Sequence, residues 1–117
     1  MLKNTRLYNN DFEDIILKAK KDDLVFIDPP YTVKHNNNAF IKYNEGLFSW
    51  EDQIRLRDSV EKAITRGAKL IITNAYHKCI MQLYKGLGKK IKLSRASVIS
   101  GKASTRGNYD EMVIKCF

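Results

Sequence analysis

The sequence predicts a single α/β domain in which parallel strands are followed by a terminal antiparallel hairpin. Two short apolar runs, residues 24–27 and 68–73, are typical of strands buried on both faces of a parallel sheet, and a segment with helical spacing precedes each. Two segments near the C-terminus, residues 91–99 and 111–117, alternate in polarity as strands do. With 117 residues, the chain is long enough for one domain and too short for two.

The first helix is expected at about residues 11–21. Asn10 and Glu13 have the three-residue spacing of a capping box, and apolar residues then recur at helical intervals. The strand at residues 24–27 follows and ends at two consecutive prolines. As the first strand of a small sheet, it has an open edge unless another segment pairs with it.

A long polar segment separates this strand from the second helix. The segment from Tyr31 to Phe48 is longer than an ordinary connecting loop, and loops of such length usually have a function. Its three consecutive asparagines are equally compatible with a solvated loop. Ser49 and Asp52 then form a second capping box, which opens a helix that Gly67 closes.

The remaining elements follow one another at short intervals. The second strand ends at Asn74, for which we expect a turn, with a position lining a pocket as the alternative. A short helix begins at His77 and reaches residue 85. Gly86 and Gly88 form a Gly-x-Gly sequence, but it follows a helix and not a strand, so it predicts a helix stop and not a cofactor loop.

The chain is strongly basic. Lys and Arg number 21 against 13 Asp and Glu, which gives a net charge of +8. Between Lys85 and Arg106 there are seven basic residues and no acidic one. This pattern indicates a polyanionic partner such as nucleic acid, and a solvated lysine-rich face is an equally good interpretation of the charge alone.

Cysteine usage and hydropathy indicate a cytoplasmic protein. Cys79 and Cys116 lie far apart in apolar contexts, as buried thiols in a reducing compartment do, and neither has zinc-ligand spacing with His35 or His77. The apolar runs are far shorter than the roughly 18 residues of a membrane span, and the N-terminus lacks the apolar core of a signal peptide. We therefore expect no metal site and no membrane association.

The sequence Asp28-Pro29-Pro30-Tyr31 carries the strongest chemical signal. It follows the end of a strand, where open α/β sheets place their active sites. Asp28 offers one hydrogen-bond acceptor to an exocyclic amine such as that of adenine, and the rigid prolines hold the carbonyl of Pro29 as a second acceptor. Accepting both amine hydrogens localises the nitrogen lone pair and makes the amine nucleophilic. Tyr31 offers an aromatic face to a planar base, which must leave the duplex to reach such a pocket.

The sequence resembles the Dam-type adenine-specific DNA methyltransferases, in the class whose target-recognition domain precedes this tetrapeptide. The resemblance spans nearly the whole chain, in NNDFEDIILKAKKDDLVFIDPPY, in FSWEDQIRL with Tyr43 before it, in LIITNAY and in RASVISGKASTRGNYDEMVI. It implies a partial Rossmann-like methyltransferase fold and methyl transfer to N6 of a flipped adenine in double-stranded DNA. It also implies S-adenosylmethionine as the methyl donor, whose sulfonium supplies the chemical driving force.

The resemblance assigns residues to catalysis and to the methyl donor. The implied catalytic residues are Asp28, Pro29, Pro30 and Tyr31. Asp28 also lies near the methyl-bearing end of the donor, while Asp11 and Phe12 contact its adenosine half. Phe12 is at least as well explained as a core residue of the first helix.

Further residues are implied to contact DNA. Tyr31 stacks on the flipped base, and Arg95, Ser97 and Arg106 contact phosphates, which positions the duplex without reading its sequence. Ser97 by itself is more typical of an exposed strand position. The polar segment at 32–48 corresponds to the family's segment beside the flipped base.

The chain departs from the family pattern on its N-terminal side. It has neither an aromatic-x-Gly-x-Gly cofactor loop nor a target-recognition domain before the tetrapeptide. We therefore interpret residues 1–117 as one domain, the C-terminal catalytic portion of such an enzyme, with a complementing N-terminal chain or a homo-oligomer covering its first strand. We expect the chain alone to bind S-adenosylmethionine weakly or not at all.

Two other hypotheses remain open. One is a non-catalytic nucleic-acid-binding remnant of such an enzyme. The other is a fragment of an RNA or protein methyltransferase, which the match of residues 95–111 to the DNA-modifying class disfavours.

Overall fold

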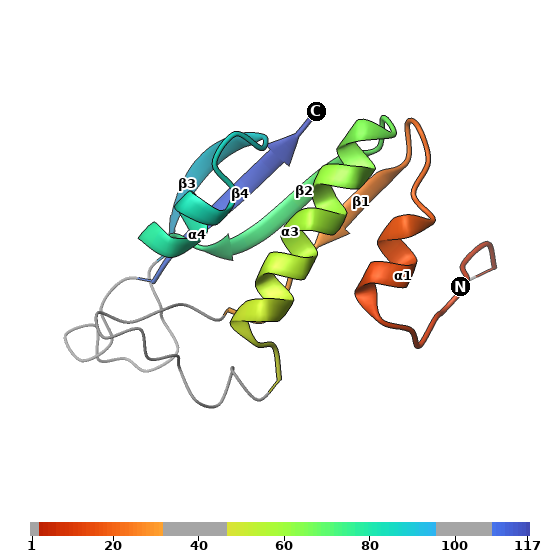
Figure 1. The fold of residues 1–117 in the computed structure, drawn as a ribbon, viewed down its shortest axis with the longest axis horizontal. Helices are drawn as coiled ribbons and strands as arrows, with labels where there is room; N and C mark the ends of the chain where they lie inside the picture. Colours follow the sequence, from red (N-terminus) through yellow and green to blue (C-terminus); the bar gives the residue numbers. More distant parts are fainter. Residues whose placement is uncertain (1–2, 32–46, 96–108) are drawn as a thin grey trace.

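The computed structural model describes residues 3–31, 47–95 and 109–117. The elements in chain order are α1 (Phe12–Leu17), β1 (Leu24–Ile27), α3 (Trp50–Thr65), β2 (Lys69–Ala75), α4 (Lys78–Leu83), β3 (Lys89–Arg95) and β4 (Tyr109–Cys116) (Figure 1). This order of helices and strands is the one that the sequence predicts.

The four strands form one mixed sheet with the spatial order β1-β2-β4-β3. β1 and β2 are parallel, with Leu24 opposite Lys69. β4 is antiparallel to both of its neighbours, and Arg95 of β3 lies opposite Tyr109 of β4. The terminal antiparallel hairpin is confirmed, whereas parallel pairing among the described strands is confined to β1 and β2.

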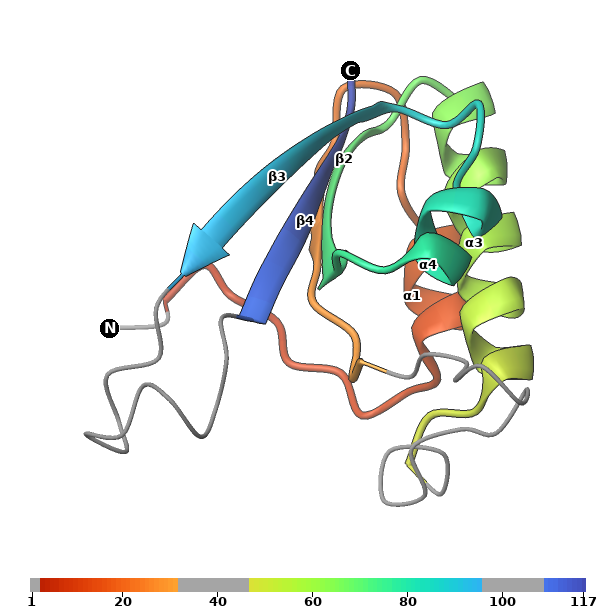
Figure 2. The ribbon, with the colours of Figure 1, turned by 90° about the vertical axis from the view of Figure 1, so that its left-hand side faces the viewer.

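The helices of the described residues, α1, α3 and α4, lie on one face of this sheet, as two views at right angles show (Figures 1 and 2). Alternate strand residues point at the helices, and those of β2 and β4, Leu70, Ile72, Met112 and Ile114, are fully buried. Leu56 of α3 packs in the same cluster. The hydrophobic core therefore lies between the sheet and a single layer of helices.

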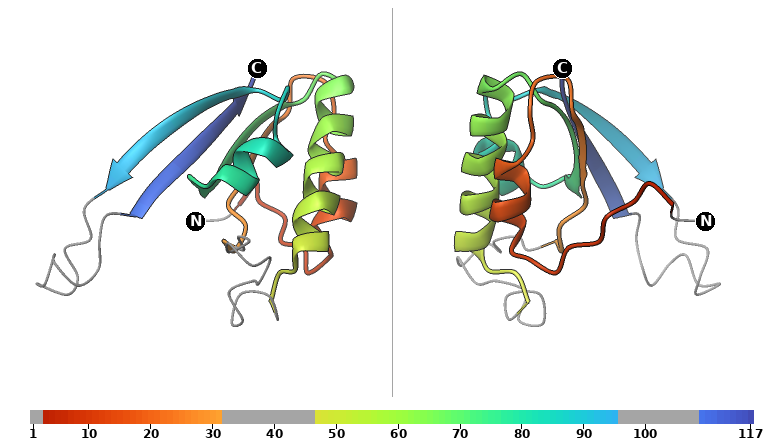
Figure 3. Two further views of the ribbon diagram at one scale, coloured as in Figure 1. Left: turned by 60° about the vertical axis from the view of Figure 1, so that its left-hand side comes forward. Right: turned by 90° about the vertical axis from the view of Figure 1, so that its right-hand side faces the viewer.

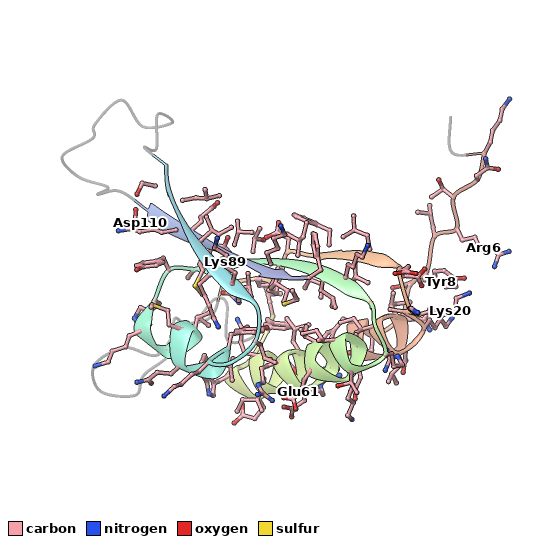
Figure 4. The ribbon with its side chains drawn as sticks, turned by 90° about the horizontal axis from the view of Figure 1, so that it is seen from above. Arg6, Tyr8, Lys20, Glu61, Lys89 and Asp110 are labelled. Atoms are coloured by element: carbon pink, nitrogen blue, oxygen red, sulfur yellow. The ribbon has the colours of Figure 1, made fainter. Side chains whose placement is uncertain are left out.

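The opposite face of the sheet is uncovered in the described part of the chain (Figure 3). Leu24 and Phe26 of β1 are 64% and 65% exposed, and Ile91 and Leu93 of β3 are 39% and 45% exposed. Side chains on this face stand away from the helices, and no described helix or strand lies over them (Figure 4).

The expectation that residues 24–27 are buried on both faces is therefore wrong. The helices cover one face only, and β1 lies at the edge of the sheet, paired on one side with β2. The predicted open edge is confirmed, because no other described strand pairs with β1.

Local side-chain hydrogen bonds delimit α1. Its N-cap is Asp11 and not Asn10, because the Asp11 carboxylate accepts a hydrogen bond from the N–H of Glu13 at 3.1 Å. The helix is shorter than predicted. The carboxylate of Asp23 accepts from the N–H of Lys20 at 2.8 Å, and this bond favours a turn over further helix.

The predicted boundaries of α3 are confirmed. The Ser49 hydroxyl accepts from the N–H of Asp52 at 3.1 Å, and the Asp52 carboxylate accepts from the N–H of Ser49 at 3.0 Å, which completes the capping box. Gly67 follows the helix with a φ of +92°, a conformation that glycine adopts without strain.

The end of β2 differs from the expectation. Asn74 is fully buried inside the strand, which continues through Ala75, so the expected turn at Asn74 is wrong. His77 begins α4 as predicted, since its Nδ1 accepts from the N–H of Cys79 at 3.2 Å. The helix stop is also confirmed, because Gly86 and Gly88 both have positive φ after α4. β3 begins at Lys89, two residues earlier than expected.

Candidate active site

The tetrapeptide lies at the carboxyl end of β1, beside the carboxyl end of β2. Ile27 pairs with Ile72, so Asp28 is the neighbour of Thr73 across the sheet. The Thr73 hydroxyl donates a hydrogen bond to Asp28 Oδ1, with 2.6 Å between the two oxygens. Asp28 is exposed, and this contact fixes one of its two carboxylate oxygens.

The two prolines are held from the helix side of the sheet. Pro29 is buried, and the carbonyl oxygen of Pro30 accepts a hydrogen bond from Gln53 Nε2 at 3.2 Å. Gln53 lies in the first turn of α3 and is fully buried. Its Oε1 accepts from Asn74 Nδ2, also at 3.2 Å.

A pocket of about 440 Å³ opens beside the tetrapeptide, between α1, β1 and α3. Its lining residues are Phe12, Ile15, Ile16, Val25, Phe26, Ile27, Asp28, Pro29, Pro30, Phe48 and Leu56. Of these residues only Asp28 is ionisable. The pocket can therefore hold a largely apolar ligand that carries a positive charge near Asp28.

Phe12 belongs to this pocket and to the core at once. It packs against the buried cluster, and its ring centroid lies 5.6 Å from that of Phe48. The guanidinium of Arg55 lies 4.3 Å above the Phe12 ring. The two interpretations of Phe12, as a core residue and as a residue of the site, are thus compatible.

Asp11 does not line the pocket but is tied to its wall through Arg55. The Arg55 guanidinium binds both carboxylate oxygens of Asp11, at 2.5 and 3.1 Å, and also binds Glu13 and Asp52 at 3.1 Å each. Sequence reasoning missed Arg55, which joins α3 to the start of α1.

These contacts shift the pKa values of Asp11, Asp52 and Arg55. The hydrogen bonds from Arg55 lower the pKa of the Asp11 carboxyl. The backbone N–H of Ser49 is the main cause that lowers the pKa of Asp52, and Arg55 adds to it. The carboxylates in turn raise the pKa of Arg55, so Asp11, Asp52 and Arg55 stay ionised at neutral pH.

The residues expected to contact DNA are less fully described. Arg95 ends β3 opposite Tyr109, at the same side of the sheet as Asp28, because β4 begins beside the carboxyl end of β2 (Figure 1). The side chain of Arg95, together with Ser97, Arg106 and residues 32–46, lies outside the described residues.

Two lysines of the basic segment have partners within the fold, and one of them, Lys92, faces a carboxylate. The ammonium of Lys90 donates to the carbonyl oxygens of Tyr84 and Leu87, at the end of α4. Lys92 lies 3.4 Å from the Asp110 carboxylate and over the ring of Tyr76. Spatial neighbours thus supply the negative charge that the sequence lacks at this point, whereas Lys85 and Lys89 remain exposed.

The thiols differ in their surroundings. Cys116 is buried, and burial raises its pKa, whereas Cys79 is half-buried with its sulfur 3.0 Å from His77 Nδ1.

Residues 3–31, 47–95 and 109–117 contain no group of three or more His, Cys, Asp or Glu residues that could hold a metal ion. Over the same residues, no helix has the length and apolar character needed to cross a membrane.

The α/β architecture with its four-stranded mixed sheet is consistent with a methyltransferase domain. The family model of the D12 class N6 adenine-specific DNA methyltransferases matches residues 1–103, and the chain belongs to this family.

Several curated proteins are similar to the chain. It is 32% identical over 110 residues to the Type II methyltransferase M1.LlaDCHI of Lactococcus lactis subsp. cremoris, and 38% identical over 99 residues to the DNA N-6-adenine-methyltransferase of Escherichia phage P1. It is also 31% identical over 116 residues to the Type II methyltransferase M.MjaIII of Methanocaldococcus jannaschii.

These matches cover most of the chain but a smaller part of each relative. They include 93%, 83% and 97% of the chain, and 38%, 13% and 40% of the Lactococcus, phage and Methanocaldococcus proteins, respectively. The chain therefore spans at most about two fifths of the length of these relatives.

Proposed function

We propose that the chain is the catalytic portion of an enzyme that transfers a methyl group to N6 of an adenine flipped out of double-stranded DNA. The observation that carries the proposal is the sequence Asp28-Pro29-Pro30-Tyr31, held at the carboxyl end of β1 on the rim of an apolar pocket. Membership of a family named for this reaction supports it.

The tetrapeptide supplies the groups that make adenine N6 nucleophilic. Asp28 Oδ1 is bound by Thr73, so Oδ2 is the oxygen that accepts one amine hydrogen, and the carbonyl of Pro29 accepts the other. Tyr31 stacks on the extruded base and offsets part of the cost of flipping. After the nitrogen has bonded to the methyl carbon, it loses one proton to water.

The pocket suits S-adenosylmethionine as the methyl donor. When bound, this donor supplies an electrophilic methyl group, and its sulfur takes the electron pair of the breaking C–S bond. Phe12 and the apolar lining fit the adenosine half, and the Asp28 carboxylate complements the positive sulfonium. Asp11 lies outside this lining, so we propose that it acts on the adenosine half through Arg55, which lies over the Phe12 ring. No described strand pairs with the outer edge of β1, so we propose that a complementing N-terminal chain or a second copy completes the pocket.

Arg95, Ser97 and Arg106 are proposed to contact the phosphates of the duplex. The backbone of Arg95 lies at the same side of the sheet as the tetrapeptide, which supports a role for the end of β3 in holding the DNA that flanks the flipped base. The exposed Lys85 and Lys89 add positive charge to the same stretch of the sequence, but Lys89 lies at the opposite end of β3 from Arg95.

Methyl transfer from labelled S-adenosylmethionine to unmethylated duplex DNA tests this proposal. The assay uses the chain alone and the chain mixed with the protein encoded immediately upstream of it. We expect transfer in the mixture, and we expect the Asp28→Ala variant to abolish it while duplex binding is retained. Retained transfer by Asp28→Ala would overturn the assigned role.

A nucleic-acid-binding remnant without catalysis is the alternative function. The uncovered edge of β1 favours it, because the site is incomplete if nothing pairs with that edge. This alternative predicts salt-dependent duplex binding by the wild-type chain and no methyl transfer in either sample.

A further inference from the structure

Two fully buried amide side chains connect β2 to the tetrapeptide. Gln53 and Asn74 are both 0% exposed, although they come from different elements. A buried amide that lacks partners destabilises the fold, so polar side chains at such positions are normally engaged on both sides. Gln53 and Asn74 bond to each other and to the backbone at either end of the pair.

The direction of each amide follows from one backbone group. The N–H of Ala75 can only donate, and it bonds to Asn74 Oδ1 at 2.8 Å. The Asn74 Nδ2 is therefore directed at Gln53 Oε1, which leaves Gln53 Nε2 to donate to the carbonyl of Pro30. The strand thus determines which end of the Gln53 amide faces the tetrapeptide.

The carbonyl of Pro30 controls the path of the backbone into Tyr31. The pyrrolidine ring fixes φ of Pro30, so ψ is the free torsion there, and the direction of the carbonyl defines it. The hydrogen bond from Gln53 to this carbonyl consequently determines the direction in which the backbone enters Tyr31. It also restrains the peptide unit between Pro29 and Pro30, to which the Pro29 carbonyl belongs.

We propose that Gln53, oriented by Asn74, is a positioning residue that aligns Tyr31 and the Pro29 carbonyl with the target base. This inference rests on the proposed function and adds a residue that the tetrapeptide itself does not contain. Thr73 and Asn74 are consecutive in β2 and face opposite sides of the sheet. Thr73 holds Asp28 directly from one side, and Asn74 acts on Pro30 from the other side through Gln53 of α3.

An isotope-labelling experiment on the 117-residue chain tests the hydrogen bond without any activity. The chain has two prolines, and Pro30-Tyr31 is its only Pro-Tyr peptide bond. Labelling proline carbonyls with ¹³C and tyrosine nitrogens with ¹⁵N therefore gives a single HNCO signal, which reports the Pro30 carbonyl. Loss of the bond from Gln53 is expected to shift this carbonyl resonance upfield.

Gln53→Met is the main variant, because methionine has a similar volume and no N–H to donate. Asn74→Ser is the milder second variant, which keeps Gln53 but removes the Asn74 Nδ2 donor that orients it. This variant keeps the test decisive if Gln53→Met does not fold. Ser59→Ala is the matched control: Ser59 is a buried polar residue of the same helix, and its hydroxyl donates to the carbonyl of Arg55. An unshifted signal in Gln53→Met, or in Asn74→Ser if only that variant folds, would overturn the proposal.

Kinetics of the complete enzyme test the consequence for the reaction. We expect Gln53→Met to lower kcat by roughly 10- to 100-fold while KM for DNA changes by less than about threefold, because the bond aligns groups without contributing to duplex binding. Unchanged kcat together with a shifted signal would overturn the positioning role. If the wild-type enzyme transfers no methyl group, the proposed function fails, while the HNCO signal still decides whether Gln53 holds Pro30.

Discussion

The two faces of the sheet contrast sharply, although the same four strands form both. On the face toward the helices, Leu70, Ile72 and Ile114 are fully buried, whereas on the other face Leu24 and Phe26 are about two thirds exposed. The side chains alternate in every strand, so local sequence alone does not explain the difference. What differs is the presence of a second layer, which the described chain supplies on one side only (Figure 2).

The tetrapeptide lies where these two environments meet. Its proline end is bonded to Gln53 inside the covered layer, and Asp28 is bonded to Thr73, which points to the uncovered face. A site built in this way has one half that folds with the core and another half whose surroundings depend on a partner.

The largest expected effect on stability comes from shortening a buried side chain on the covered face. Ile72→Ala should lower the free energy of unfolding by about 2–5 kcal/mol, because it leaves a cavity in the core. Phe26→Ala, on the uncovered face, should change it by less than about 1 kcal/mol. Urea denaturation of both variants measures the contrast, and equal losses would show that the two faces do not differ in this way.

Charging the uncovered face is expected to weaken association. Leu24 and Phe26 would each contribute about 1.5–3 kcal/mol when buried by a partner, so replacing both with lysine should lower the affinity by at least about a hundredfold. Light scattering at tens of micromolar, with and without the complementing chain, measures this effect. Leu47→Lys is the control, because Leu47 is 75% exposed and lies outside the sheet. A wild-type chain that stays monomeric and binds no partner would contradict the prediction.

Removing the hydroxyl beside Asp28 is expected to have a moderate effect on catalysis. Thr73→Val preserves shape but frees the Asp28 carboxylate, and we expect about a tenfold fall in kcat of the complete enzyme, with stability nearly unchanged. Thr65→Val is a suitable control, since the Thr65 hydroxyl donates to the carbonyl of Glu61 and not to a residue of the site. If both variants have wild-type kcat, Thr73 does not position Asp28.

The smallest expected effect concerns the solvent-facing side of the helix layer. The pKa values of Asp11 and Asp52 are lowered in the folded chain, so these groups contribute stability above the ordinary carboxyl pKa of about 3.9, and this contribution is lost as the pH falls through their lowered values. Arg55→Met should flatten the pH dependence of the melting temperature in this acidic range. Part of the slope should remain, because the backbone of Ser49 is the main cause of the shift at Asp52. Identical pH profiles would exclude Arg55 as a source of the acid sensitivity.

Elements with strong local signals could be predicted from the sequence. The capping box at Ser49 and Asp52 and the glycine stop at Gly67 depend on neighbouring residues, and the structure confirms both. The burial of residues 24–27 depends on what covers them, which no local pattern encodes. The turn predicted at Asn74 is wrong for a related reason, because the bond of Asn74 to Gln53, a residue distant in the sequence, outweighs the preference of asparagine for turns.

The candidate site could be predicted only in part. Residue types alone single out Asp28 and its three successors, and their catalytic role stays a prediction. Thr73, Gln53 and Arg55 act on the site through contacts with residues far away in the sequence. Gln53 did leave a signal, because it shares the helical spacing of the buried residues Leu56 and Val60 and is polar.

The order of the strands also has a consequence for folding kinetics. The hairpin closes between Arg95 and Tyr109, whereas β1 must find β2 across the whole of α3 and the segment before it, with Leu24 opposite Lys69. Closing the longer loop costs more chain entropy. As the edge strand of the described sheet, β1 gains strand contacts with β2 alone. We expect β1 to join last and to detach first under denaturant or proteolysis. The tetrapeptide would then be lost while α3, β2 and the hairpin still hold together, so a folded core is no guarantee of an assembled site.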